Sequence, residues 1–219
     1  MFKIKICGVT TPDDARAIAQ AGADAIGLNF YAVSPRYIEP EAARRLADQL
    51  PDRIVKVGLF VNASARTILQ VFARVDLDLV QLHGDEPPAF LAELGDLPVM
   101  KAFRLGDQGL APVLAYLDTC RSLDAAPKLV LIDSFTKGSY GGTGSTADWG
   151  EAAGYPRGEG LPPLVLAGGL KPSNVASAIR QVRPMAVDTA SGVESAPPRK
   201  DPALVREFVL AAARAFGEA

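Results

Sequence analysis

Five polar side chains of this sequence have the chemistry of a catalytic or binding site. Cys7, His83, Asp133 and Asp188 lie at or near the ends of short runs of Val, Ile and Leu, and Arg36 follows another such run. A thiolate can accept a proton and a carboxyl group can donate one. If these segments are parallel strands, their ends meet on one rim, and Cys7 and Asp133 could perform acid–base chemistry there.

Strand alternation sharpens this expectation. Successive side chains of a strand point to opposite faces, so Lys5 and Cys7 share one face of the segment Lys3–Cys7. The same rule places Asp133 on the inner face, together with Leu131. An ammonium group beside a thiol favours the thiolate, so we expect Lys5 to lower the pKa of Cys7.

These residues also have structural interpretations. A buried cysteine is usually a small core residue, which is how we interpret Cys120. An aspartate at a strand end often caps the following turn. His83 is the only histidine, and no Cys, His or carboxylate stands at ligand spacing from it, so we expect no metal site. Holding a loop by hydrogen bonds is the expected role of His83.

Glycines follow the last two apolar segments. Gly168 and Gly169 come after one of them, and Ser191 and Gly192 come after the other. In barrels these two loops often bind phosphate, because backbone N–H groups can approach the anion where no Cβ intervenes. A second glycine-rich stretch, residues 141–145, lacks a lysine and a preceding strand, so alone it indicates a flexible turn.

The segments that must position these residues alternate between two periods. Short runs rich in Val, Ile and Leu predict strands at Lys3–Cys7, Ala25–Phe30, Ile54–Val61, Leu79–His83, Val99–Phe103, Lys128–Asp133, Leu164–Ala167 and Ala186–Thr189. Stretches of helical period predict helices at Thr11–Gln20, Pro40–Leu50, Ala65–Arg74, Pro87–Leu94, Leu110–Arg121, Ala147–Ala153, Ser173–Gln181 and Pro202–Phe216.

Eight βα units in one series predict a parallel sheet, and eight is the number that closes a (β/α)8 TIM barrel. We expect a single domain over residues 1–219. A doubly wound open sheet is the alternative, but its Gly-x-Gly-x-x-Gly signature is missing after the first strand, which runs into Gly8-Val9-Thr10.

Composition limits the classes of partner. The chain has 219 residues, 23 Lys plus Arg and 25 Asp plus Glu, and a formal charge of -2. This balance favours neither a nucleic-acid nor a membrane partner. No apolar run reaches the length of a membrane span, and no signal segment is evident at the N-terminus. Two separated cysteines make no disulfide framework, so we expect a cytoplasmic protein.

An ordered series of motifs resembles the phosphoribosylanthranilate isomerase family across nearly the whole chain. Any one of these motifs is weak, but the ordered set is specific. They are Lys5-Ile6-Cys7-Gly8-Val9-Thr10, Gly27-Leu28-Asn29-Phe30 with Ser34-Pro35-Arg36, Val57-Gly58-Leu59-Phe60-Val61-Asn62, Gln81-Leu82-His83-Gly84, Ile132-Asp133-Ser134, Gly141-Gly142-Thr143-Gly144, Asp148-Trp149, Leu166-Ala167-Gly168-Gly169-Leu170, Ser191-Gly192-Val193-Glu194 and Lys200-Asp201.

The resemblance implies a monomeric or homodimeric barrel without metal or organic cofactor. Such an enzyme converts the phosphorylated small molecule N-(5-phosphoribosyl)anthranilate to its 1-deoxyribulose phosphate isomer, the Amadori step of tryptophan synthesis. By the same resemblance, Asp133 is the general acid and Cys7 the general base. Arg36 engages the anthranilate carboxylate, Asp188 contacts the ribose hydroxyls, and the glycine loops bind the phosphate. The sequence leaves open whether the loop 134–146 closes over the substrate, a movement that its glycines would permit.

Three alternatives stay open at this point. An indole-glycerol-phosphate synthase would place a lysine as its acid, which this sequence does not. A dual-substrate isomerase that also acts in histidine synthesis would end its first strand in Asp rather than Cys7. A catalytically silent barrel would have no use for a thiol and a carboxyl group at one mouth.

Overall fold

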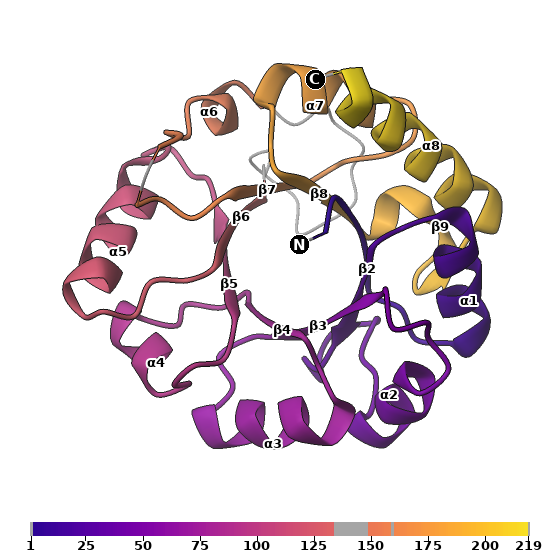
Figure 1. Cartoon of the computed structure of the whole chain (residues 1–219), viewed down its shortest axis with the longest axis horizontal. Coiled ribbons are helices and arrows are strands. Elements are labelled where there is room, and N and C mark those ends of the chain that lie inside the picture. The colour runs from indigo at the N-terminus through magenta and orange to yellow at the C-terminus, as the bar shows by residue number, and fades with distance from the viewer. Residues whose placement is uncertain (1, 134–148, 159, 219) are drawn as a thin grey trace.

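The computed structural model describes residues 2–133, 149–158 and 160–218, and over these residues the chain forms a closed parallel barrel. The strands pair in the order β1-β2-β3-β4-β5-β6-β7-β8, and β8 returns to β1. Figure 1 looks into the ring of strands, with the helices arranged around its outside. The predicted (β/α)8 fold class is confirmed.

The strands lie close to their predicted positions. Buried Val, Ile and Leu dominate them, as expected of a parallel sheet covered by helices. Their bounds are β1 Ile4–Cys7, β2 Ala25–Asn29, β3 Val55–Phe60, β4 Leu79–Leu82, β5 Val99–Arg104, β6 Leu129–Asp133, β7 Leu164–Ala167 and β8 Ala186–Thr189.

Several helices start at a capping side chain or at a proline, which has no backbone N–H to satisfy in the first turn. The hydroxyl of Thr11 accepts a hydrogen bond from the backbone N–H of Asp14, and Ser64 does the same for Thr67. The helices are α1 Pro12–Ala21, α2 Pro40–Ala47, α3 Ala65–Val75, α4 Pro88–Ala92, α5 Ala111–Ser122, α6 Gly150–Ala153, α7 Val175–Val182 and α8 Pro202–Glu218. The helix predicted at Ala147–Ala153 is described only from Gly150 onward, because residues 147 and 148 lie outside the described residues.

Alternation along the strands divides the apolar core into two parts. The outer core lies between strands and helices and includes Ile6 and Ile132. The inner core fills the barrel itself and includes Met100 and Leu131. Consecutive residues of one strand enter different cores. The core that holds a residue's neighbour therefore shows which face a polar residue at the strand end occupies.

A short hairpin after β8 was not predicted. A 3-10 turn, Ser191–Val193, leads into β9 (Glu194–Ala196), which pairs antiparallel with β10 (Arg199–Lys200). In this pairing Lys200 is the register partner of Glu194. The hairpin brings two charged side chains back to the barrel rim.

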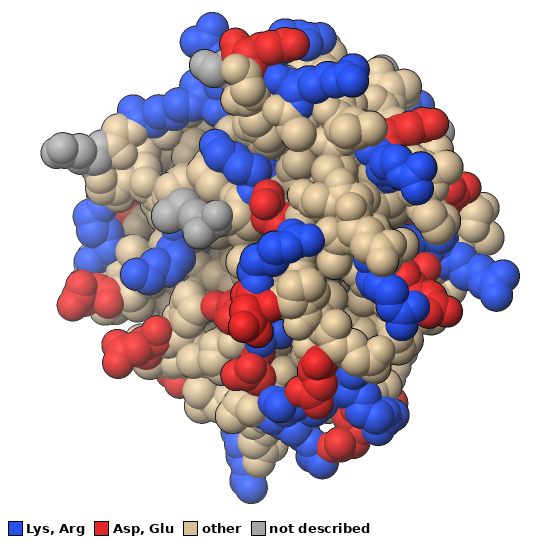
Figure 2. Space-filling model, turned by 45° about the vertical axis from the view of Figure 1, so that its right-hand side comes forward, with Lys and Arg blue, Asp and Glu red and all other residues tan. Residues whose placement is uncertain are grey.

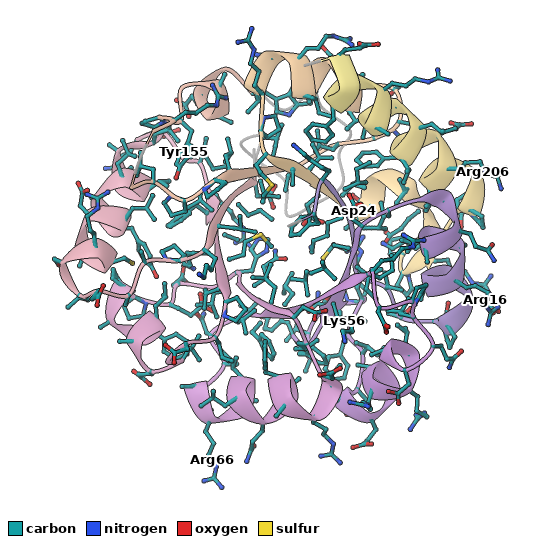
Figure 3. All side chains as sticks on the ribbon, in the orientation of Figure 1. Arg16, Asp24, Lys56, Arg66, Tyr155 and Arg206 are labelled. Carbon is teal, nitrogen blue, oxygen red and sulfur yellow. The ribbon has the colours of Figure 1, made fainter. Side chains whose placement is uncertain are left out.

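The surface carries charges of both signs. On the face drawn in Figure 2, Lys and Arg residues are interspersed with Asp and Glu. In Figure 3, Arg16, Arg66 and Arg206 project outward from helices, whereas Asp24 and Lys56 lie at the ring of strands. Within the described part of the chain, no helix is both long and apolar enough to cross a membrane.

Candidate active site

The predicted acid and base lie at the carboxyl ends of their strands. Cys7 ends β1 and Asp133 ends β6. The outer core takes their neighbours Ile6 and Ile132, so both reactive side chains belong to the inner face of the barrel. The alternation argument is confirmed for both strands, and the structure places Cys7 and Asp133 at one mouth.

Lys5 and Asp188 form a buried ion pair beneath Cys7. The Lys5 Nζ donates to Asp188 Oδ1 at 2.9 Å, and the two side chains are 0% and 7% exposed. Asp188, expected to contact ribose hydroxyls, is therefore held by Lys5 on the inner face of β8. This pair joins β8 to β1, the two strands whose pairing closes the barrel.

Lys5 lowers the pKa of Cys7 as expected, but the net shift of this pKa is upward, which was not expected. Burial raises the pKa of the Cys7 thiol, and although Lys5 opposes this shift, the nearby Asp188 carboxylate adds to it. The sequence argument counted the ammonium of Lys5 but neither the burial nor the second carboxylate. Lys5 therefore limits the cost of forming the thiolate without reversing it.

The surroundings of Asp133 favour its protonated form. Burial raises the pKa of Asp133 and the Asp188 carboxylate raises it further, while Arg104 on the neighbouring strand lowers it. Arg104 is the register partner of Asp133 across β5 and β6. A carboxyl group with a raised pKa suits the role of a proton donor, as expected.

His83 faces Asp133 rather than holding a loop by its ring. Its Nε2 lies 3.7 Å from Asp133 Oδ2, and its Nδ1 lies 3.2 Å from the side-chain nitrogen of the buried Gln81. Burial lowers the pKa of His83 to about 4, and Arg104 and Lys5 lower it in the same direction. The ring is therefore neutral at pH 7, and alternation along β4 turns both Gln81 and His83 into the barrel.

Arg36 crosses the entrance beside Cys7. Gly8 has a φ of 74°, and a Cβ added there would lie 2.4 Å from Arg36 Cδ, so the arginine stem occupies the space that a larger residue would fill. Its Nε donates to Glu194 Oε1 at 2.8 Å and its Nη2 donates to Oε2 at 2.6 Å. Lys200 Nζ donates to the same carboxylate at 2.7 Å.

The two glycine loops contact each other at the rim. Gly168 and Gly169 have φ values of 90° and 62°, in the left-handed region that favours glycine. A Cβ on Gly192 would lie 1.8 Å from the carbonyl oxygen of Leu170, so only glycine permits this approach. The Thr189 hydroxyl donates to the same carbonyl at 2.7 Å. The structure thus brings Ser191 and Gly192 together with the loop after β7.

Sequence reasoning missed three residues of this rim. Glu194 and Lys200 were quoted within motifs but given no role, and Arg104 was not considered. Inward alternation along β5 could have found Arg104, because Met100 and Ala102 belong to the inner core. The glycine-rich stretch 141–145 and the loop 134–146 lie outside the described residues. Among the described residues, no group of three or more His, Cys, Asp or Glu side chains is arranged to hold a metal ion.

A closed α/β barrel with a carboxyl group and a thiol on its carboxyl rim, beside two glycine loops, is an arrangement typical of barrel enzymes, whose active sites lie on this rim. The sequence model described as N-(5'phosphoribosyl)anthranilate (PRA) isomerase matches residues 4–211. The chain belongs to this family.

Relatives of this family match over nearly their full length. The N-(5'-phosphoribosyl)anthranilate isomerase of Trichlorobacter lovleyi is 47% identical over 99% of this chain and 100% of its own. That of Geobacter sulfurreducens is 46% identical over 95% of this chain and 97% of its own. These matches favour the isomerase over the synthase and the dual-substrate alternatives.

Solved structures agree with the barrel geometry. The phosphoribosyl anthranilate isomerase of Thermotoga maritima is 40% identical with a TM-score of 0.87, covering 98% of this chain and 100% of that one. A further isomerase structure, in complex with reduced 1-(o-carboxyphenylamino)-1-deoxyribulose 5-phosphate, is 38% identical with a TM-score of 0.83, covering 98% and 100%. The Thermotoga maritima enzyme has been described both as a dimer and as generated monomers.

Proposed function

We propose that this chain converts N-(5-phosphoribosyl)anthranilate to 1-(2-carboxyphenylamino)-1-deoxyribulose 5-phosphate by an Amadori rearrangement, with Asp133 as general acid and Cys7 as general base. The observation that carries the proposal is the placement of one thiol and one carboxyl group with a raised pKa at the same barrel mouth. Family membership supports the substrate.

Asp133 performs the first proton transfer. Its protonated carboxyl gives a proton to the ring oxygen of the ribose, the bond from that oxygen to C1 breaks, and the C1–N bond becomes an iminium. Burial raises the pKa of Asp133 and so favours the protonated carboxyl, which this step requires. The neutral His83 ring beside it adds no competing positive charge.

Cys7 performs the second transfer. Its thiolate removes the C2 proton, which the adjacent iminium has made acidic, and the electron pair neutralises the nitrogen to give an enolamine. Transfer of the hydroxyl proton to C1 then gives the ketone. The proton on Cys7 is released to solvent and Asp133 takes one up, so the reaction is balanced as an isomerisation. Apart from the cleavage of the C1–O bond only protons move, and this chemistry requires neither a metal nor an organic cofactor.

The thiolate must form in spite of its raised pKa. Lys5 and Lys200 both lower the pKa of Cys7, against burial. A substrate iminium next to the sulfur adds a further positive charge at the moment when the base acts. The productive state pairs a neutral Asp133 with a thiolate Cys7, and the charge that develops on the substrate stabilises that thiolate.

The remaining rim residues hold the substrate. Arg36 binds the anthranilate carboxylate, for which a guanidinium is suited by its paired donors. Asp188 accepts hydrogen bonds from the ribose hydroxyls through the oxygen that Lys5 does not contact. The phosphate binds the backbone N–H groups of the two glycine loops, which are Gly168 with Gly169 and Ser191 with Gly192.

Turnover of freshly prepared phosphoribosylanthranilate, followed by loss of anthranilate fluorescence, tests the proposal. We expect wild type to be active without added metal, and Cys7→Ser and Asp133→Asn each to lose about 10² to 10⁴ in kcat. Cys120→Ser is the matched control, because Cys120 is the other buried thiol and lies on α5. It should keep wild-type kinetics.

Two outcomes would contradict the proposal in different ways. Substrate binding without turnover by wild type would show a silent barrel. Near-full activity of Cys7→Ser would show that the base is another group, even with the substrate correct.

A further inference from the structure

Hydrogen bonds to Glu194 hold one edge of the Arg36 guanidinium and leave its other edge open. Of its five N–H donors, Glu194 accepts one from Nε and one from Nη2. The second donor of Nη2 and one donor of Nη1 form the end edge of the plane, and the other Nη1 donor points toward the arginine stem. Within the described residues these three donors have no acceptor. A carboxylate can bind that edge by two parallel hydrogen bonds.

Arg36, Glu194 and Lys200 form a charged cluster, and Lys200 determines its net charge. Arg36 and Glu194 alone would be neutral, and a neutral pair would attract a substrate carboxylate weakly. Lys200 donates to Glu194 at 2.7 Å, and the side chains of Lys200 and Glu194 are 1% and 2% exposed. The cluster therefore carries one net positive charge, and its only partly exposed member is Arg36, whose side chain is 21% exposed.

The cluster is also fixed to the backbone. Lys200 donates to the carbonyl oxygen of Ala190 at 3.1 Å, at the start of the glycine loop after β8. The β9–β10 pairing sets Glu194 opposite Lys200, and Gly8 leaves room for the stem of Arg36. Burial alone would raise the pKa of Glu194, but hydrogen bonds from Arg36 and Lys200 more than offset it and keep the carboxylate ionised.

We infer that Glu194 and Lys200 are positioning residues that make Arg36 selective for the carboxylate of the substrate. Glu194 fixes the orientation of the guanidinium, so that its free edge faces the mouth. Lys200 cancels the charge of Glu194, so that Arg36 keeps its own. The inference rests on the proposed function and adds residues to which no role has been assigned.

A comparison of two substrates tests it. Phosphoribosylanthranilate carries the carboxylate, and N-(5-phosphoribosyl)aniline lacks it but has the same sugar and phosphate. The ratio of their kcat/KM values measures carboxylate recognition. We expect Glu194→Gln to lower this ratio about tenfold or more, mainly through KM, because a neutral amide cannot accept both guanidinium hydrogen bonds.

Lys200→Met should also lower the ratio, because it leaves Arg36 neutralised by Glu194. The double variant Glu194→Gln/Lys200→Met removes both buried charges at once, so it avoids an unpaired charge that could prevent folding. It should still lose selectivity, since the orientation of Arg36 is no longer fixed. In an Arg36→Met background, Glu194→Gln should change the ratio no further.

The control for a merely structural effect is Glu86→Gln. Glu86 pairs with Lys101 at 2.8 Å, and the side chains are 2% and 3% exposed, so this ion pair is as buried as the one under test. Lys101 lies on the helix side of β5, between the inward residues Met100 and Ala102. Glu86→Gln should lower stability and leave the substrate ratio unchanged.

Three results separate the possible failures. A wild-type ratio in both Glu194→Gln and the double variant overturns the positioning roles. An unchanged ratio in Arg36→Met shows that another group binds the carboxylate, which overturns both the inference and the assigned role of Arg36. An inert wild type overturns the proposed function itself.

Discussion

Replacing Lys5 by methionine removes the ammonium group nearest to Cys7 and keeps a side chain of similar length. A Cβ placed on Gly27 would lie 2.6 Å from Cys7 Sγ and 3.0 Å from Lys5 Nζ, so the thiol and the ammonium lie within about 6 Å of each other. Both residues are buried, and the ammonium lowers the pKa of the thiol. Losing it should make the Cys7 thiolate rarer.

The size of the effect follows from Coulomb's law. Two unit charges about 5 Å apart interact by about 3 kcal/mol at an effective dielectric constant of about 20. A difference of about 1.4 kcal/mol is a factor of ten. The thiolate fraction of Cys7 should therefore fall by as much as ~100-fold in Lys5→Met. The fall will be smaller to the extent that Asp188, without its partner, takes up a proton.

Alkylation by iodoacetamide measures the thiolate directly. The assay uses a Cys120→Ser background and follows modification of Cys7 by mass spectrometry. The rate should be proportional to the reagent concentration, because a rate limited by unfolding would not depend on it. Asp188→Asn should have the opposite effect, because the Asp188 carboxylate raises the pKa of Cys7. Lys101→Met, which disrupts a buried ion pair elsewhere, should leave the rate unchanged.

An unchanged or faster alkylation rate in folded Lys5→Met would refute the reasoning. It would mean that the Asp188 carboxylate neutralises the charge of Lys5, so that the ammonium does not affect the pKa of Cys7. The raised pKa of Cys7 would then be set by burial and the Asp188 carboxylate without opposition from Lys5.

Three further predictions concern stability and binding. Burial raises the pKa of Asp133, so the folded state favours the protonated carboxyl, and this contribution to stability is lost as pH rises. The Asp133→Asn variant should therefore be more stable than wild type at pH 8 but not at pH 3, as measured by urea unfolding. The pKa of His83 falls to about 4, so its contribution is present above about pH 6.5 and lost toward pH 4; a His83→Gln variant should lack this part of the acid transition. Gly192→Ala places a Cβ against the Leu170 carbonyl and should weaken binding of inorganic phosphate, measured by calorimetry, whereas Gly106→Ala, where a Cβ meets nothing within 4 Å, should not.

The sequence was sufficient for the barrel and for the faces of its strands. Alternation is a property of a few consecutive residues, so the inward placement of Lys5, Cys7 and Asp133 followed from their immediate neighbours. The capping of α1 by Thr11 was equally local. These interactions need no knowledge of distant parts of the chain.

The electrostatics of the site were not predictable in the same way. Lys5 and Asp188 are separated by 183 positions, and Arg36 and Glu194 by 158. A pKa depends on burial and on every charge near the group, so local alternation identified Lys5 as a partner of Cys7 and missed Asp188 and Lys200. The β9–β10 hairpin was missed because it is short and charged, with no apolar alternation to indicate strands.

The inner core closes the barrel beneath Cys7 and Asp133. Phe2, Met100 and Leu131 belong to this core and are almost completely buried, so within the described residues water reaches Cys7 and Asp133 from the mouth. A bound substrate would occupy that same opening. Hydrogens exchanged between these two groups and the sugar would then stay apart from bulk water until the product leaves. With a substrate tritiated at C2, the tritium that Cys7 accepts would reach the solvent only as the product leaves, and the rate of its release would record how long this isolation lasts relative to one turnover.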